Sequence, residues 1–307
     1  MKRRPGAFMQ GTNIFRPSWP VHPLRWRNGA VLPGTSFARL NSLEVRLARN
    51  PLEVRQAQKL RYHVFYEEMS AVPRGAARLG KRDADLFDSV CDHLLVLDHE
   101  AEDKRKLARW RRNPQIVGTY RLLRQDVAEL GSGFYSQGEF DLAPLVARHR
   151  QHRFLELGRS CVLKPYRTKR TLELLWQGIM SYVRQHDLTV MIGCASLAGT
   201  DPRELALPLS FLHHHARAPM PWRARAHPSR YVEMNMMEKE DIDTRAALRA
   251  LPPLIKGYIR AGAYIGDGAV VDHQFGTTDV LIVLPVAAIE KRYAAHFGPG
   301  DELAAAS

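Results

Sequence analysis

The sequence lacks any apolar segment long enough to cross a membrane, and it contains few cysteines. No apolar run in the 307 residues approaches the roughly 20 residues of a membrane span, so we expect a soluble or peripheral protein. The three cysteines, Cys91, Cys161 and Cys194, have neither paired nor metal-ligand spacing. We therefore predict a reducing compartment, cysteines that pack in the core, and no bound metal.

Acidic residues are also scarce, most of all at the N-terminus. Lys and Arg number 45 against 32 Asp and Glu, which gives a formal net charge of +13. Such an excess indicates an acidic partner: a nucleic acid, an anionic lipid or an acidic carrier protein. The first 43 residues contain no acid but seven basic residues between Lys2 and Arg39, and they lack the apolar core of a secretory signal.

These features predict a basic, disordered N-terminal arm over residues 1–42 and one folded domain over residues 43–307. Phe15, Trp19 and Trp26 lie among the basic residues of the arm. Basic residues mixed with aromatic ones are typical of segments that bind anionic membrane surfaces, which is the alternative interpretation of the arm.

The folded part shows no internal repeat, and no G-x-G-x-x-G motif follows the first expected strand, which argues against a doubly wound nucleotide-binding sheet. Asn50 and Pro51 form the start signal of a helix that ends near Met69. Periodicity and turn signals predict one α/β domain. We expect strands at 43–47, 93–98, 116–123, 153–163, 189–195 and 280–284, helices at 51–69, 142–149, 172–183, 211–215 and 254–261, and a glycine-rich turn before the last strand.

Residues 153–176 carry the strongest signal, a strand followed by a basic turn and an amphipathic helix. Glu156 and Arg159 lie three residues apart in the strand and would point to opposite faces if it were regular. Gly158 permits a β-bulge, which would bring both side chains to one side. The alternative is a surface ion pair on an ordinary βα unit.

The helix after the turn is expected to bury one face and to bind phosphate at its N-terminus. Helical spacing predicts that the buried residues are Leu172, Leu175, Trp176, Ile179 and Val183. Arg167, Lys169 and Arg170 converge with the free backbone N–H groups of the first turn, which is a favourable arrangement for a phosphate.

A bulged central strand that is splayed from its neighbour and leads into a phosphate-binding helix resembles the Gcn5-related N-acyltransferase (GNAT) fold. The resemblance implies a mixed central sheet with flanking helices. It also implies that the splay admits a pantetheine thioester and that backbone N–H groups past the bulge polarise the thioester carbonyl.

The chain also resembles the acyl-homoserine-lactone synthases, and the matching positions are Arg61, Phe65, Asp85, Asp88, Arg121, Glu156 and Arg159. The tryptophan that those synthases place after the first helix has no counterpart here, since Ala71 lies near that position. This departure argues against lactone synthesis.

A closer resemblance, from about residue 43 onward, is to the bacterial L-ornithine N-alpha-acyltransferases. It rests on the strings LRYHVFYEEM, DLFDSVCDHLLVLD, ELGRSCVL, LLWQGIMSYV, FLHHHARAP, LPPLIKGYIRAGAYIGDGAVVD and FGTTDVLIVLP. The resemblance implies an acyltransferase that moves a 3-hydroxyacyl chain from acyl carrier protein to the α-amine of L-ornithine, giving lyso-ornithine lipid. A separate O-acyltransferase would then complete the lipid.

The basic turn supports a carrier-protein donor. Common acetyltransferases need glycines at two positions of this loop to wrap the coenzyme A pyrophosphate, and Arg170 and Leu172 stand there. A single phosphopantetheine phosphate needs less wrapping and can be held by charge. We therefore assign phosphopantetheine binding to Arg167, Lys169, Arg170 and Thr171, with the acyl-phosphopantetheine of the carrier as donor substrate and no permanently bound cofactor.

The site residues receive roles from this resemblance. Glu156 is the candidate general base, acting directly or through water, with a purely electrostatic role as the alternative; Arg159 is the second catalytic residue. Asp85 and Asp88 could hold the cationic groups of the substrate, and Arg121 or Arg159 its carboxylate. Alternatively, these charges form a buried network that fixes the loop over the core.

Three consecutive histidines, His213, His214 and His215, do not form a metal site, because consecutive helical residues spread around the helix axis. We expect His214 to line the acceptor pocket. Three other functions remain open: a basic nucleic-acid-binding protein, although no nucleic-acid motif is present; an acyl-homoserine-lactone synthase-like enzyme, which would need S-adenosylmethionine as acceptor; and an acyltransferase for glycine, glutamine or lysine. The expected location is cytoplasmic, on the inner face of the cytoplasmic membrane.

Overall fold

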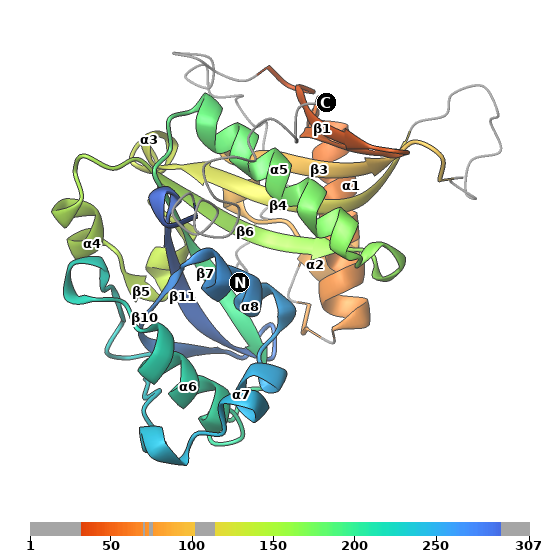
Figure 1. The fold of residues 1–307 in the computed structure, drawn as a ribbon. Helices are drawn as coiled ribbons and strands as arrows, with labels where there is room; N and C mark the ends of the chain where they lie inside the picture. The colour runs from red at the N-terminus through yellow and green to blue at the C-terminus, as the bar shows by residue number, and fades with distance from the viewer. Residues whose placement is uncertain (1–31, 70, 74–75, 102–113, 290–307) are drawn as a thin grey trace, which may run out of the picture.

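The computed structural model describes residues 32–69, 71–73, 76–101 and 114–289, and within them the chain forms one mixed sheet with helices on both faces (Figure 1). The strands lie in the spatial order β1-β2-β3-β4-β6-β7-β11-β10-β8-β5, and β9 pairs with β10. Their bounds are β1 Ser36–Leu40, β2 Leu43–Leu47, β3 Asp92–Asp98, β4 Gln115–Arg124, β5 Phe140–Asp141, β6 Phe154–Val162, β7 Val190–Ala198, β8 Arg225–Ala226, β9 Tyr231–Val232, β10 Tyr264–Asp272 and β11 Thr277–Pro285.

Some of the α-helices begin at a residue whose side chain caps the first turn. The Asn50 side chain accepts hydrogen bonds from the N–H groups of Leu52 and Glu53 at the start of the first helix, as the start signal predicted. The α-helices are α1 Pro51–Tyr62, α2 Ala76–Gly80, α3 Gln125–Ala128, α4 Ala143–Arg148, α5 Lys169–Gln185, α6 Ala206–Ala216, α7 Thr244–Ala250 and α8 Pro253–Ala261. A π-helical segment, η2 His63–Glu68, continues α1, and short 3-10 helices are η3 Leu86–Ser89, η4 Tyr135–Gly138, η5 Lys164–Tyr166, η6 Met220–Trp222 and η7 Lys239–Asp241.

Adjacent residues of one strand show how the two faces of the sheet are covered. Leu94 of β3 packs in the core that includes Leu174 of α5, whereas Leu95 packs with Leu60 of α1 on the opposite face. Figure 1 shows α5 and α8 in front of the sheet and α1 behind it. Further along the α1 side, η4, β5 and α4 cover the sheet through a third core cluster, which includes Phe140 and Phe154.

At the centre of the sheet, the pairing of neighbouring strands changes from antiparallel to parallel. β6 and β7 are parallel, and their register has only three residue pairs, from Phe154↔Val190 to Glu156↔Ile192. Beyond Glu156 the two strands separate, while each keeps its antiparallel neighbour on the other side. The splay that the sequence predicted therefore lies between β6 and β7.

Three expectations from the sequence differ from the structure. Strand β1 lies at Ser36–Leu40 and pairs with β2, so the sheet begins inside the segment predicted as an arm; residues 1–31 lie outside the described residues, and the rest of that prediction stays untested. The expected glycine-rich turn contains the nine-residue strand β10. Leu172 is 44% exposed, because the buried face of α5 is formed by Leu174 and Leu175 and their helical neighbours.

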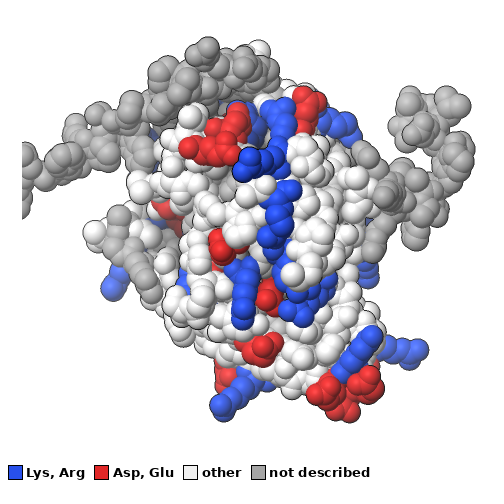
Figure 2. Space-filling model, turned by 90° about the vertical axis from the view of Figure 1, so that its left-hand side faces the viewer, with Lys and Arg blue, Asp and Glu red and all other residues white. Residues whose placement is uncertain are grey.

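Positive charge is not confined to the N-terminal residues. On the face shown in Figure 2, Lys and Arg side chains form a band with Asp and Glu side chains beside it. Among the described residues, no helix is long and apolar enough to span a bilayer.

Candidate active site

A β-bulge lies at the predicted place in β6. Arg159 and Ser160 of β6 together lie opposite the single residue Tyr120 of β4, and Arg159 has the left-handed backbone angle φ of +49°. The extra residue is thus one position later than Gly158. As predicted, the bulge brings Glu156 and Arg159 to one side, since both side chains contact the segment that starts η4.

Beside the bulge, where the fork between β6 and β7 begins, the two backbones approach each other closely. A Cβ at Gly193 of β7 would lie 2.3 Å from the carbonyl oxygen of Leu157 in β6, so only glycine allows this approach. A small apolar space of about 10 Å³ lies at the fork. It is lined by Leu157, Met191, Ile192, Gly193, Cys194, Tyr258 and Ile282.

Glu156 anchors η4 to the central strand. Its carboxylate accepts hydrogen bonds from the N–H groups of Tyr135 and Ser136, both at 2.7 Å, and from the Ser136 hydroxyl at 2.5 Å. Burial raises the pKa of Glu156, and the hydrogen bonds from Ser136 and Tyr135 oppose that rise. Because both oxygens are engaged by donors, the geometry favours the positioning and electrostatic role over direct proton abstraction.

Arg159 joins η4 to the loop before β3. Its guanidinium lies 3.3 Å from the Tyr135 hydroxyl, 4.7 Å from the centre of the Tyr135 ring, and within ion-pair distance of Asp83 and Asp85. Burial lowers the pKa of Arg159, whereas the nearby Tyr135, Asp83 and Asp85 raise it. The net effect is a rise, so Arg159 stays positively charged. A guanidinium held by two acids and an aromatic ring is rigidly placed beside the bulge.

Arg61 and Asp88, both predicted to bind substrate, instead form the interior of the loop network. Arg61 is 1% exposed in its side chain and donates to Asp83 and Asp88, each at 2.8 Å. Gln58 also donates to Asp88. Burial opposes ionisation of Asp88, but the adjacent guanidinium of Arg61 holds the pKa of this carboxyl well below its usual range. Arg61 and Asp88 therefore belong to a buried charge network, which was the alternative to a role in substrate binding.

Asp85 lies nearer the surface of the same network, and its partner Arg121 is buried. Arg121 donates to Asp85 at 2.6 Å, and its guanidinium contacts the rings of Phe87 and Tyr135. The Asp85 side chain is 27% exposed and caps η3. Of the predicted substrate-binding acids, Asp85 alone keeps access to solvent beside Arg159.

Phe65 lies near the central strand, whereas His214 lies on α6. Phe65 packs edge-to-face on Phe275 with ring centres 5.7 Å apart, and the guanidinium of Arg159 lies over the Phe275 ring. The Nε2 of His214 is 3.0 Å from the carbonyl oxygen of Met237. His214 does not line the 580 Å³ cavity described below, and its place in an acceptor pocket stays a prediction.

The basic turn before α5 has two exposed cations, of which Lys169 lies 3.5 Å from the Glu173 carboxylate one turn later. Lys169 and Arg170 are exposed at the first turn of the helix, which Thr168 caps. Arg167 is held by Glu68 and by the carbonyl oxygen of Val162. Thr171 is buried, and both its N–H and its hydroxyl contact Thr168, so its side chain is not available to a phosphate.

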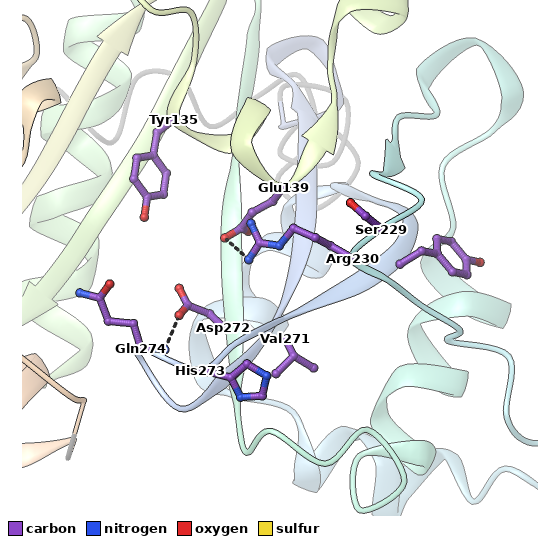
Figure 3. A pocket seen from close by; sticks show the side chains of 9 residues that line it. Tyr135, Glu139, Ser229, Arg230, Val271, Asp272, His273 and Gln274 are labelled. Atoms are coloured by element: carbon purple, nitrogen blue, oxygen red, sulfur yellow. Dashed lines mark hydrogen bonds and ion pairs between the residues drawn. The ribbon is translucent and has the colours of Figure 1, made fainter. Parts of the chain in front are cut away.

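The sequence did not predict a cavity of about 580 Å³ that lies beside η4 (Figure 3). Its lining residues are Tyr135, Glu139, Ser229, Arg230, Tyr231, Val271, Asp272, His273 and Gln274. Burial, with Asp279 and Asp272 nearby, raises the pKa of Glu139 to about 7, although Cys194 and Arg230 oppose the rise.

A signal for this cavity was present in the sequence. Asp272 and Asp279 lie within the strings IGDGAVVD and FGTTDVLIVLP, where an acid ends one apolar strand and another opens the next. A carboxylate in an otherwise apolar strand indicates a buried functional group. Nothing local indicated Glu139, because its contacts are with β7, β10 and β11.

Comparison with known proteins agrees with this architecture. Residues 60–177 match the family model described as "Acetyltransferase (GNAT) domain", which confirms the predicted fold class. The chain is 56% identical over 262 residues to the L-ornithine N(alpha)-acyltransferase of Agrobacterium fabrum, covering 85% of this chain and 87% of that protein. It is 54% identical over 273 residues to the protein of the same name from Rhizobium meliloti, covering 89% and 90%.

More distant likeness is found among solved structures. An N-acyl amino acid synthase from uncultured soil microbes superposes with a TM-score of 0.45 at 10% identity, covering 81% of this chain and 94% of that one. The acyl-homoserine-lactone synthase LasI gives a TM-score of 0.41 at 14% identity, covering 80% and 90%.

Proposed function

The chain belongs to the L-ornithine N(alpha)-acyltransferase family and is an acyltransferase, and from this premise we propose that it acylates the α-amine of L-ornithine with a 3-hydroxyacyl chain carried by acyl carrier protein. The product would be lyso-ornithine lipid. The observation that carries the proposal is the match of most of the chain to relatives of that name at 42–56% identity.

The geometry of β6 and β7 supports a thioester substrate. We infer that the pantetheine arm enters the fork and that the carbonyl of its thioester lies at the backbone N–H groups after the bulge. The α-amine attacks the carbonyl carbon, a C–N bond forms and the C–S bond breaks. The amine loses one proton, and the departing thiolate gains one. Glu156 would support this step by holding η4, and Arg159 would add fixed positive charge beside the developing oxyanion.

The activity is tested with radiolabelled acyl carrier thioester and a panel of acceptors: ornithine, lysine, glutamine, glycine and S-adenosylmethionine. We expect acyl-ornithine as the main product and a lower kcat/KM with the matching coenzyme A thioester. If another acceptor is acylated and ornithine is inert, the proposed acceptor is wrong. If the coenzyme A thioester is used with equal kcat/KM, the proposed preference for a carrier-protein donor is wrong.

Charge at the start of α5 should control use of the carrier. The double variant Lys169→Glu, Arg170→Glu is expected to raise the KM for acyl carrier protein about tenfold at low salt, because two exposed cations at a docking surface become repulsive to an acidic partner. The effect should shrink as salt screens the charges. Kinetics at two ionic strengths measure it.

Arg184→Glu is the matched control, because Arg184 is exposed near the other end of the same helix. It should leave the KM for the carrier unchanged. An equal rise in KM for the control would mean that only the net charge matters.

We also propose that the basic N-terminal residues attract the protein to an anionic membrane surface, where a lipid product must be released. Sedimentation with anionic vesicles, compared between the full chain and a chain that begins at Leu32, tests this. The shorter chain keeps the whole of β1. Equal sedimentation would contradict the proposal.

A further inference from the structure

Three carboxylates lie close together at the 580 Å³ cavity: Glu139 and Asp272 line it, and Asp279 is buried beside them. Glu139, Asp272 and Asp279 each offer an oxygen, and these oxygens all lie within 4.8 Å of one another. The residues come from the segment after η4, the end of β10 and the start of β11. Figure 3 shows the side chains of Glu139 and Asp272 pointing into the same space.

This cluster is not satisfied by the residues around it. Asp279 is only 7% exposed, and its Oδ1 has no hydrogen-bond partner among the described residues. The nearby cation is Arg230, whose guanidinium lies 3.7 Å from Glu139 and is 38% exposed. One partly exposed guanidinium does not neutralise three carboxylates, so a further positive charge would stabilise their ionised forms.

The cluster lies next to the fork where the thioester is proposed to bind. Cys194 lines the fork, and its thiol donates to Glu139 at 3.2 Å and to the Ser136 hydroxyl at 3.3 Å. Ser136 is also a donor to Glu156. The cavity and the fork are therefore connected through the contact between Cys194, which lines the fork, and Glu139, which lines the cavity.

We propose that this cavity is the acceptor site and that Glu139, Asp272 and Asp279 bind the side-chain ammonium group of a diamino acid. The inference rests on the proposed function and deepens it, because it explains why a basic amino acid would be chosen over a neutral one. An ammonium group can donate to all three carboxylates at once, including the unpartnered oxygen of Asp279. The α-amine, three methylenes away in ornithine, then extends toward the fork.

The charge state of the cluster gives the proposal a second, independent signature. Burial, together with Asp279 and Asp272, raises the pKa of Glu139 to about 7, against the effects of Cys194 and Arg230. The pKa of Asp279 is raised as well, chiefly by burial. A bound ammonium group favours the ionised carboxylates, so its binding should release protons near pH 7.

The first experiment measures selectivity between ornithine and norvaline, which has the same carbon chain without the side-chain amine. The wild-type protein should prefer ornithine by on the order of 10²-fold or more in kcat/KM, because norvaline would leave the carboxylates unpaired. Asp272→Asn and Asp279→Asn should each reduce this preference at least about tenfold. They should lower kcat/KM for ornithine and leave kcat/KM for norvaline little changed.

Glu240→Gln, at an exposed position of η7, is the control and should keep the wild-type preference. An unchanged preference in both cavity variants would overturn the inference. Wild-type protein that acylates neither amino acid would instead contradict the proposed function, so the two failures can be told apart.

The second experiment needs no catalysis. Calorimetry of ornithine binding to the wild-type chain, in buffers of different ionisation enthalpy, should detect proton release near pH 7. Norvaline should show none, and Glu139→Gln should reduce the release. Oxygen ligands also suit Mg²⁺ or Ca²⁺. Tight binding of either metal alone that ornithine does not displace would overturn the inference in favour of a metal site.

Discussion

Replacing Glu156 by glutamine is expected to lower kcat by at least about 10²-fold, since a displacement of roughly 1 Å at a reacting centre can cost that much. The carboxylate now accepts from two backbone N–H groups and one hydroxyl. Glutamine offers one oxygen and one NH₂ group, so one N–H of η4 would face another donor. Tyr135 would then move, and with it the contact that holds Arg159.

The pH profile separates the two roles considered for Glu156. If it positions η4, the acidic limb of kcat should persist in Glu156→Gln, because another group takes the proton. If it is the general base, that limb should disappear. Ser136→Ala is the milder control: it removes the hydroxyl contact to Glu156 and the weak one from the Cys194 thiol, keeps both backbone N–H contacts, and should cost less than about tenfold. Unchanged turnover in Glu156→Gln would contradict both roles.

Arg61→Met should cause the largest loss of stability, a decrease of about 3–5 kcal/mol in the free energy of unfolding. Methionine has a comparable length but leaves Asp83 and Asp88 buried without their main cation. Urea denaturation measures the change. The matched control is Arg153→Met, because Arg153 forms an exposed ion pair with Asp187 at 3.7 Å; its cost should stay within about 0.5 kcal/mol.

This comparison decides between the two interpretations of the charged residues. A stable Arg61→Met protein with a raised KM for ornithine would restore the substrate-binding role that the sequence suggested. A destabilised protein whose remaining folded fraction has normal KM would assign Arg61 to the architecture of the loop.

The sequence predicted the central strand and its helix because their signals are local. Glu156, Gly158 and Arg159 lie within four residues, and strand, turn and helix follow one another without interruption. The cap at Asn50 is equally local. These features depend on short-range geometry, so they are visible without knowledge of what lies across the sheet.

β10 was missed because its glycines serve contacts between distant segments. A Cβ at Gly266 would lie 2.9 Å from Cβ of Leu281 and 3.1 Å from the carbonyl oxygen of Ala224, and Gly268 has a φ of +82° where the register with β11 shifts. Glycine here permits close packing and a bulge, whereas in sequence it suggests a turn. The carboxylate cluster was missed for the same reason, since three separate segments build it.

The close approach at Gly193 has a consequence for which positions near the fork can vary during evolution. The Leu157 carbonyl meets a position without a side chain there, so any other residue would push the two backbones apart. Leu157, Met191 and Ile282 line the small apolar space beside it with their side chains. Substitutions at these three positions can change the size of that space, whereas a substitution at position 193 would displace the strands themselves.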